Sequence, residues 1–249
     1  MTQAPDPFLH HPELRARVAC SESSFFRNFN LDDLLKMHPQ LEPFRPFAHS
    51  DDEREAIRSE ILGAHRGELW VFAYGSLMWD PALRFQEVRR VFAPAHARRF
   101  ILKDDKGGRG SQDAPGLMAA LDSGGGCEGL AYRIAEHDVE VETEILFRRE
   151  MIAPGYVPTF IPVQIDNREI EVLAFLADHS APTIEPDISR SDQVRWIATG
   201  AGFLGTSRDY LMQIVQQLTL LGITDRDCAA LLRDVDAHIS KGQAQDNRS

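Results

Sequence analysis

Glu150 is the residue of this sequence whose type and position best suit proton-transfer chemistry. The residues before it are expected to form a helix in which Leu146 and Phe147 share one face. Because Glu150 follows them by four and three positions, its carboxylate falls on the same inward face. Burial and the partial negative charge of a helix C-terminus both raise the pKa of a carboxyl group, as a base working near neutral pH requires. A structural salt bridge to Arg148, Arg149 or another arginine is the alternative interpretation.

The segment Tyr74-Gly75-Ser76-Leu77 is a second candidate site, at the end of a buried strand expected over 69–74. A β-branched and aromatic run followed by Gly-Ser predicts a strand that runs into a turn. Backbone N–H groups in such a turn can converge on a carboxylate, and glycine allows the ligand to approach the backbone closely. Many strands end in this way, so the segment alone does not separate a binding site from an ordinary turn.

Residues 200–205 (GAGFLG) match the glycine pattern of dinucleotide-binding loops. That pattern needs a strand before it, a helix after it and an acidic residue at the end of a second strand about 20 residues later. Here a helical segment over 191–199 precedes the glycines, and residues 220–226 contain a helix end and a cap. The sequence therefore favours a flexible connection between two helices, and a nicotinamide cofactor is rejected.

The elements that must position these residues are predicted from periodicity and from local start and stop signals. Ser50 and Glu53 form a capping-box pattern that begins a helix expected to run to about Arg66. Asp166-Asn167 is the expected turn of a hairpin, Gly222 an expected helix stop and Thr224 an expected N-cap. Strands are expected at 69–74, 87–93, 97–103, 116–122, 128–134, 157–165 and 168–177, and further helices at 136–150, 191–199, 207–221 and 225–239.

The order of these elements predicts an α+β fold. Strands do not alternate strictly with helices, which argues against a doubly wound parallel sheet. A mixed sheet that curls into a barrel is expected instead. Residues 1–50, which prolines interrupt, are expected to form an N-terminal arm, packed or partly flexible, and residues 51–249 a single catalytic domain.

Composition and charge exclude several classes of protein. The 249 residues carry a formal net charge of -11, which disfavours nucleic acids and anionic membrane surfaces as partners. The stretch from Arg84 to Arg109 is locally basic, so its cations are either solvated strand faces or an attractor for a small anionic substrate. The three cysteines match no zinc spacing and fit a reducing compartment. Because the N-terminus lacks a secretory pattern and no apolar run approaches about 20 residues, a cytoplasmic location is expected.

Four segments together resemble the ChaC family, most closely its bacterial members. Residues 71–79 (VFAYGSLMW) resemble the family's VFGYGSLxW signature, and residues 146–152 (LFRREMI) with Tyr156 resemble its RE…GY segment. Residues 129–133 (GLAYR) resemble its GVAYR strand, and residues 201–207 with Tyr210-Leu211 resemble its GPLGTNxxYL segment. The segments occur in the family's order, and they give the glycine pattern an explanation without a nucleotide.

The resemblance implies a small mixed β-barrel of the gamma-glutamylcyclotransferase-like type with flanking helices. It also implies intramolecular cleavage of the γ-glutamyl bond of glutathione, which gives 5-oxoproline and Cys-Gly without a metal or an organic cofactor. No obligate protein partner is predicted. Glu150 is the implied general base and acid. The implied substrate contacts are Val71, Phe72, Ala73, Tyr74, Gly75, Ser76, Leu77, Arg109 and Tyr156.

Two positions depart from the family pattern. Ala73 stands where the family usually has Gly, and its methyl group is expected to crowd the substrate loop slightly. Leu117 stands where an Arg is common, and if that Arg holds an anionic group, the substrate preference differs here. A cyclotransferase acting on another γ-glutamyl amino acid or amine therefore stays open. A binding protein without activity is the third interpretation, but it predicts a missing acid/base residue, and Glu150 is present.

Overall fold

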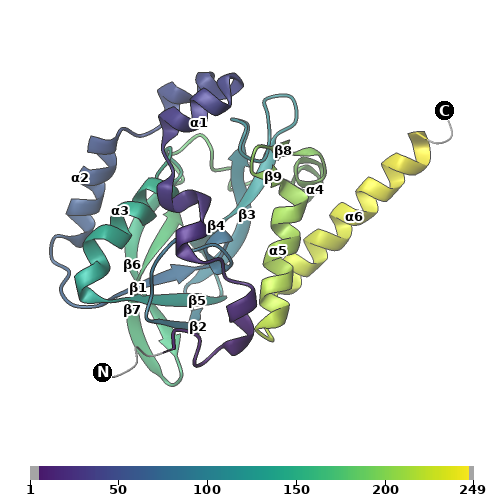
Figure 1. Cartoon of the computed structure of the whole chain (residues 1–249). Helices are drawn as coiled ribbons and strands as arrows, with labels where there is room; N and C mark the ends of the chain where they lie inside the picture. Colours follow the sequence, from purple (N-terminus) through teal and green to yellow (C-terminus); the bar gives the residue numbers. More distant parts are fainter. Residues whose placement is uncertain (1–5, 247–249) are drawn as a thin grey trace. The chain divides into compact units, whose positions relative to one another are not determined.

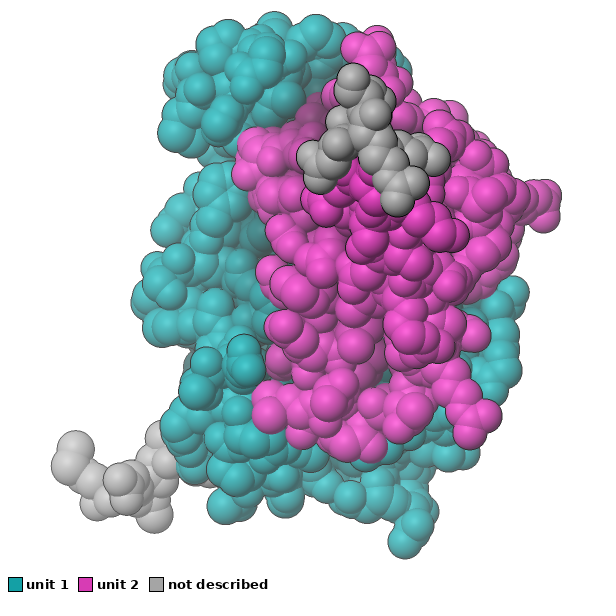
Figure 2. Space-filling model, turned by 90° about the vertical axis from the view of Figure 1, so that its right-hand side faces the viewer, with its two compact units in different colours: residues 1–98, 121–178 teal, residues 99–120, 179–249 magenta. Residues whose placement is uncertain are grey.

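A computed structural model describes residues 6–246 of the chain as a mixture of strands and helices (Figure 1). The chain divides into two units, coloured teal and magenta in Figure 2. The first unit contains Met1–Arg98 and Leu121–Asp178, and the second contains Arg99–Ala120 and His179–Ser249. The strands β3 (His96–Asp104) and β4 (Gly116–Ser123) have residues in both units.

Five strands of the first unit close into a barrel. In order of pairing they are β1 (Leu69–Ala73), β5 (Cys127–Ile134), β2 (Glu87–Ala93), β6 (Tyr156–Ile165) and β7 (Arg168–Ala177). Neighbours in this order are antiparallel, and a parallel pairing of Val71 with Leu173 joins β7 back to β1. The predicted mixed sheet that curls into a barrel is confirmed. Its closure removes edges that an open sheet would expose.

The core of the barrel is built largely from β-branched, aliphatic and aromatic side chains, which pack well on a pleated surface. Val71, Phe72 and Ala73 are each 0% exposed, so β1 is buried on both of its faces. The turn that follows β1 therefore starts from a strand that packing holds firmly in the barrel. The core cluster consists of Phe72, Tyr74, Val91, Ala93, Leu121, Cys127, Ala131, Ile161, Val163, Ile165, Val172 and Ala174.

The hairpin of β6 and β7 confirms the turn predicted at Asp166-Asn167. The ladder pairs Ile165 with Arg168 and continues to Tyr156 opposite Ala177. Asp166 has a φ of 45°, in the left-handed region that short hairpin turns use and that Asp tolerates.

Two helices of the first unit test predictions made from the sequence. α2 (Asp51–Leu62) begins with the predicted capping box, in which Glu53 N donates to Ser50 Oγ at 3.2 Å and Ser50 N donates to Glu53 Oε2 at 2.7 Å. It ends at Leu62 rather than at residue 66, because glycine at position 63 is a poor helix former. α3 (Val139–Glu150) follows the short 3-10 helix η6 (Glu136–Asp138) and ends at Glu150. Leu146 and Phe147 are 0% and 1% exposed, which confirms the predicted inward face.

The N-terminal segment of the first unit folds as a series of short helices. It buries Leu14, Phe29, Leu34 and Leu35 and thus adds to the packing of that unit. The short helices are η1 (Pro12–Ala16), η2 (Ser21–Ser23), η3 (Phe25–Asn28), α1 (Leu31–Met37) and η4 (Pro39–Phe47).

The second unit is mainly helical, with α4 (Arg190–Thr199), the hairpin β8 (Ala201–Gly202) and β9 (Gly205–Thr206), α5 (Ser207–Leu220) and α6 (Arg226–Asp246). Gly222 has a φ of 67° and donates to Thr219 O at 3.0 Å, as expected of a helix stop. The predicted N-cap Thr224 is wrong. Cys228 N donates to Asp225 Oδ1 at 3.0 Å, and a carboxylate at this position also suits the positive end of the helix dipole. No helix within residues 6–246 is both long and apolar enough to cross a membrane.

Candidate active site

The turn after β1 contains the predicted segment Tyr74–Leu77. Ser76–Met78 form the single 3-10 turn η5, which Met78 N closes by donating to Gly75 O at 2.9 Å. Among the described residues, no acceptor is found for the backbone N–H groups of Gly75, Ser76 and Leu77. Three adjacent unused donors are the arrangement that a carboxylate ligand needs.

Tyr74 is anchored at its side chain and at its carbonyl. Its Oη donates a hydrogen bond to Phe175 O on β7 at 3.0 Å. Its carbonyl oxygen accepts from Nε of the buried Arg98 at 2.6 Å, and Arg98 Nη2 donates to Glu128 O on β5 at 2.6 Å. The barrel therefore holds the turn in place before any ligand arrives, as a preorganised site requires.

Glu150 combines a nearly buried side chain with one free oxygen. Its side chain is 13% exposed, and its Oε1 accepts a hydrogen bond from Arg149 Nε at 2.9 Å. Burial raises the pKa of Glu150 above its ordinary value, although the charge and the hydrogen bond of Arg149 act in the opposite direction. Within the part of the chain that the structure describes, Glu150 Oε2 has no hydrogen-bond partner, so it can take up a proton. The sequence offered a carboxyl group of raised pKa and an ion pair with an arginine as alternatives. The structure shows both features at Glu150.

Arg149 connects Glu150 to the turn after β1. Its Nη2 donates to Ser76 Oγ at 2.8 Å, and its Nη1 donates to the carbonyl oxygen of Asp80 and lies 3.8 Å from Asp80 Oδ1. The side chain of Arg149 is only 2% exposed, so these contacts are shielded from water. The sequence suggested Arg149 only as one of several possible partners of Glu150 and gave no sign of its bond to Ser76.

Phe175 on β7 brings together aromatic residues from several of the predicted segments. Its ring packs edge-on against Phe147 of α3, with centroids 5.4 Å apart, and against Tyr156 of β6, with centroids 6.4 Å apart. Its carbonyl oxygen receives the hydroxyl of Tyr74. Phe175 lies outside every motif identified in the sequence, and its place in an apolar strand resembles that of any core residue.

Arg109 and Leu117 lie in the second unit. The guanidinium of Arg109 is 4.9 Å from the centroid of the Tyr210 ring, and its Nη1 donates to Thr206 O at 3.2 Å. Leu117 is fully buried, and its backbone N donates to Ser207 Oγ at 3.0 Å. Both residues therefore contact the segment 201–211, which contains one of the four motifs described above.

The glycine-rich segment forms an ordered hairpin, which corrects the expectation of a flexible connection. Phe203 N donates to Gly107 O at 3.0 Å and Leu204 N donates to Gly108 O at 2.8 Å. A Cβ at Gly202 would lie 2.2 Å from Gly107 O, so glycine allows the two backbones to approach.

The basic stretch from Arg84 to Arg109 consists largely of paired cations, which favours strand faces over an attractor for the substrate. Arg84 pairs with Glu22, Arg89 with Asp166, Arg90 with Glu128, and both Lys103 and Lys106 with Asp105.

Comparisons with known proteins agree on one family. A family model described as "ChaC-like protein" matches residues 69–238. The glutathione-specific gamma-glutamylcyclotransferase of Escherichia coli (strain K12) is 38% identical over 189 residues, which cover 75% of this chain and 81% of the relative. Glutathione-specific gamma-glutamylcyclotransferase 1 of Homo sapiens is 29% identical over 164 residues, which cover 64% of this chain and 73% of the relative.

A solved structure supports the fold. The crystal structure of a glutathione-specific gamma-glutamyl cyclotransferase from yeast superposes with a TM-score of 0.64 at 19% identity. The match covers 69% of this chain and 97% of the yeast chain.

Proposed function

Because this chain belongs to the ChaC-like protein family, we propose that it is a glutathione-specific gamma-glutamylcyclotransferase. It cuts the γ-glutamyl bond of glutathione and releases 5-oxoproline and Cys-Gly. One observation carries the proposal: Arg149 links Glu150, a carboxyl group of raised pKa, to a turn with unused backbone donors.

The substrate supplies both reacting groups. The α-amine of its glutamyl residue attacks the γ-carbonyl carbon, so a C–N bond forms inside a five-membered lactam while the bond to the cysteinyl nitrogen breaks. Such an intramolecular attack is fast when the chain is held folded back on itself. The protein must therefore fix the glutamyl end of the substrate and exclude water.

Glu150 moves the proton. A free α-amino group has a pKa of about 7.7–8.0, so most of the attacking amine is an ammonium group near pH 7. Ionised Glu150 accepts that proton at Oε2, and the protonated residue then returns a proton to the leaving amine of Cys-Gly. A raised pKa suits both transfers, because the base must hold the proton between them.

The turn after β1 fixes the substrate. The free N–H groups of Gly75, Ser76 and Leu77 bind its α-carboxylate, while Arg149 holds Ser76 and Glu150 in register. Val71, Phe72 and Ala73 lead into this turn from the buried strand, and Tyr74 anchors its start. Tyr156 and Arg109 stay predicted substrate contacts.

A different leaving group is the alternative that one observation favours. Leu117 stands where an Arg is common in the family, and it is fully buried. A γ-glutamyl amino acid or amine would use the same lactam chemistry with a different leaving-group contact. A binding protein without activity would have no use for a carboxyl group of raised pKa with a free oxygen.

The proposal is tested by incubating the purified full chain with glutathione and measuring 5-oxoproline and Cys-Gly. The two products are expected in equal amounts, with γ-glutamyl-alanine turned over more slowly at the same concentration. If γ-glutamyl-alanine is turned over faster than glutathione, the substrate is another γ-glutamyl compound. If neither compound gives 5-oxoproline, the proposal that the chain is a cyclotransferase is wrong.

The proposed compartment is the cytoplasm. Cys20, Cys127 and Cys228 are free thiols, as expected of a protein in a reducing compartment. The exposed thiol of Cys20 and the proposed thiol substrate, glutathione, both fit such a compartment.

A further inference from the structure

The segment Ser24–Phe29, called here the arm hook, precedes the family match at residues 69–238 and yet contacts the helix that carries Glu150. Phe26 N donates to Ser24 Oγ at 3.2 Å, which caps the 3-10 helix η3, and Phe29 is buried at 5% exposure. The arm hook is thus an ordered part of the first unit with two side chains, Phe26 and Arg27, directed at α3.

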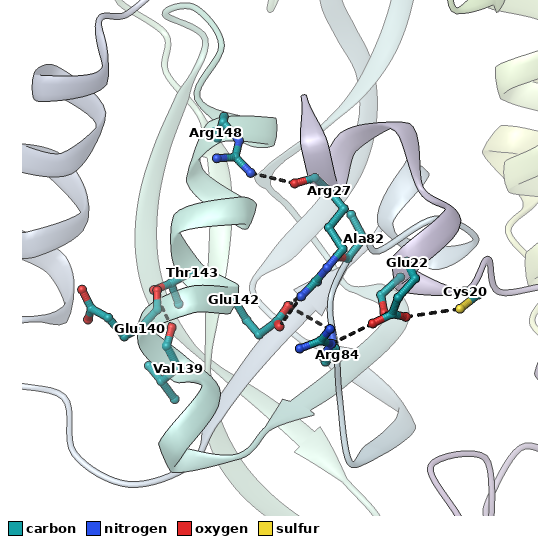
Figure 3. A network of polar contacts seen from close by, with 11 residues as sticks. Cys20, Glu22, Arg27, Ala82, Arg84, Val139, Glu140, Glu142, Thr143 and Arg148 are labelled. Atoms are coloured by element: carbon teal, nitrogen blue, oxygen red, sulfur yellow. Dashed lines mark hydrogen bonds and ion pairs between the residues drawn. The ribbon is translucent and has the colours of Figure 1, made fainter. Parts of the chain in front are cut away.

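Arg27 clamps α3 through a buried, bidentate ion pair (Figure 3). Its Nη1 and Nη2 each donate to Glu142 at 2.8 Å, and Nη1 also donates to Ala82 O at 2.9 Å. The side chains of Arg27 and Glu142 are 10% and 1% exposed. The carbonyl oxygen of Arg27 in turn accepts from Arg148 Nη2 at 2.7 Å. The arm hook is therefore tied to α3 at two points, one of them directly before Arg149.

Phe26 contacts Arg149 itself. The guanidinium carbon of Arg149 lies 4.3 Å from the centroid of the Phe26 ring, a close cation–π contact. The other contacts of this guanidinium are Glu150, Ser76 and Asp80. Because Phe26 occupies a face of the guanidinium, water is excluded there, and the planar group stays oriented toward its partners.

We infer that Phe26 and Arg27 are positioning residues for the reaction, because they hold Arg149 in the orientation that keeps Glu150 aligned with the turn Gly75–Leu77. The inference rests on the function proposed above. Neither residue touches the substrate in this account. Arg27 fixes the helix, and Phe26 fixes the guanidinium that the helix presents.

This role has a consequence that packing alone would not have. If the Phe26 ring is removed, water reaches the guanidinium of Arg149 and the group can rotate. Glu150, the proposed proton acceptor, is then held less precisely relative to the amine of the bound substrate. Turnover should then fall more than substrate binding, because the backbone donors of the turn stay in place. A merely structural residue would instead change the amount of folded protein and leave turnover per folded molecule as it was.

The first test compares Phe26→Ala with Phe26→Tyr and Phe25→Ala in the full chain, with glutathione as substrate. Phe25 is the matched control, since it is an exposed aromatic of the same helix whose ring contacts include Phe26 and Phe29. Phe26→Ala is expected to lower kcat by about tenfold, as loss of a desolvated cation–π contact implies, with KM changed less than about threefold. Phe26→Tyr should restore most of kcat, and Phe25→Ala should stay within about twofold of the parent.

The second test removes the clamp without leaving a buried charge unpaired. In the double variant Arg27→Met with Glu142→Met both charges disappear together, so the chain is expected to fold. Its kcat should fall by several-fold while KM is nearly kept. Turnover per folded molecule at the parent level in both Phe26→Ala and the double variant would overturn the inference, as would an equal loss in Phe25→Ala.

Failure of the inference and failure of the proposed function are distinguishable. If the parent chain forms 5-oxoproline and Glu150→Gln does not, the proposed function stands whatever the arm-hook variants do. If the parent chain forms none, the proposed function fails first.

Discussion

Two of the carboxylates of α3, Glu142 and Glu150, stand in opposite situations although both are withdrawn from water. Glu142 is 1% exposed, and it accepts hydrogen bonds from Arg27 Nη1 and Nη2 at 2.8 Å and from Arg84 N at 2.9 Å. Glu150 is 13% exposed and accepts one hydrogen bond, from Arg149. Burial alone therefore does not mark a catalytic carboxyl group. Glu150, the proposed acid/base residue, combines burial with one oxygen that has no hydrogen-bond partner among the described residues.

The largest effect is expected from Glu150→Gln. Glutamine keeps the shape and can still accept from Arg149, but it cannot take the ammonium proton. A general acid–base group contributes about 10²–10⁴-fold, and because Glu150 is proposed to serve two transfers, kcat should fall by the upper end of that range. KM should change little. Steady-state kinetics on folded protein measure this, and a fully active Glu150→Gln enzyme would remove Glu150 from the mechanism.

Gly75→Val is expected to have the next largest effect, on binding. The β-branched side chain would occupy the space beside the free N–H groups on which the substrate carboxylate is proposed to lie. Loss of one hydrogen bond to a charged group weakens binding by about 10- to 100-fold. Calorimetry with glutathione checks this, with circular dichroism to verify the fold. Unchanged affinity in a folded variant would show that the carboxylate binds elsewhere.

Glu142→Gln should have a smaller effect on turnover and a clear effect on stability. Breaking one side of a buried ion pair costs about 3 kcal/mol or more in the free energy of unfolding. Turnover per folded molecule should fall by no more than about tenfold, since Glu142 holds Arg27 and the backbone N of Arg84 and takes no part in the proposed proton transfers. Urea unfolding and kinetics on the same preparation measure both quantities. A loss of turnover as large as that of Glu150→Gln would erase the contrast between the two carboxylates.

Removal of metal ions is expected to have no effect. Lactam closure needs a base and a bound carboxylate, and Glu150 and the Gly75–Leu77 turn are proposed to supply both. Dialysis against EDTA should leave kcat unchanged. Activity that disappears on dialysis and returns with a divalent ion would contradict this proton-transfer scheme.

Much of the first unit could be predicted from local sequence signals. The capping box at Ser50 and Glu53 and the turn at Asp166 depend on residues close together in the chain, and both are confirmed. The inward face of α3 follows from helical spacing alone, so the burial of Leu146 and Phe147 was predictable. The N-cap Thr224 was wrong because Asp225 is an equally good candidate in sequence, and only the backbone geometry selects between them.

The partners of the site could not be predicted, because they come from distant parts of the chain. Arg149 contacts Phe26 in the N-terminal segment and Ser76 in the turn after β1, and both residues are far from it in the sequence. Phe26 stands in a stretch without steady periodicity, and Phe175 is one of many apolar residues in a strand. Side-chain type and spacing identify Glu150 as a candidate. Whether each of its carboxylate oxygens accepts a hydrogen bond depends on tertiary structure.

The sign of a pH effect on stability tests the central claim most directly. Thermal unfolding of the parent chain and of Glu150→Gln should be measured side by side from acid to neutral pH. Because burial raises the pKa of Glu150 in the folded state, the folded chain binds this proton more tightly than the unfolded chain. The stability that protonated Glu150 provides is therefore lost as pH rises through the folded pKa. The Tm of the parent is expected to fall relative to that of Glu150→Gln as pH rises, and kcat/KM of the parent is expected to rise over the same interval. A parent that instead gains stability over Glu150→Gln as pH rises would show that the ion pair with Arg149 outweighs burial and lowers the pKa of Glu150 in the folded state, and the central claim would be wrong.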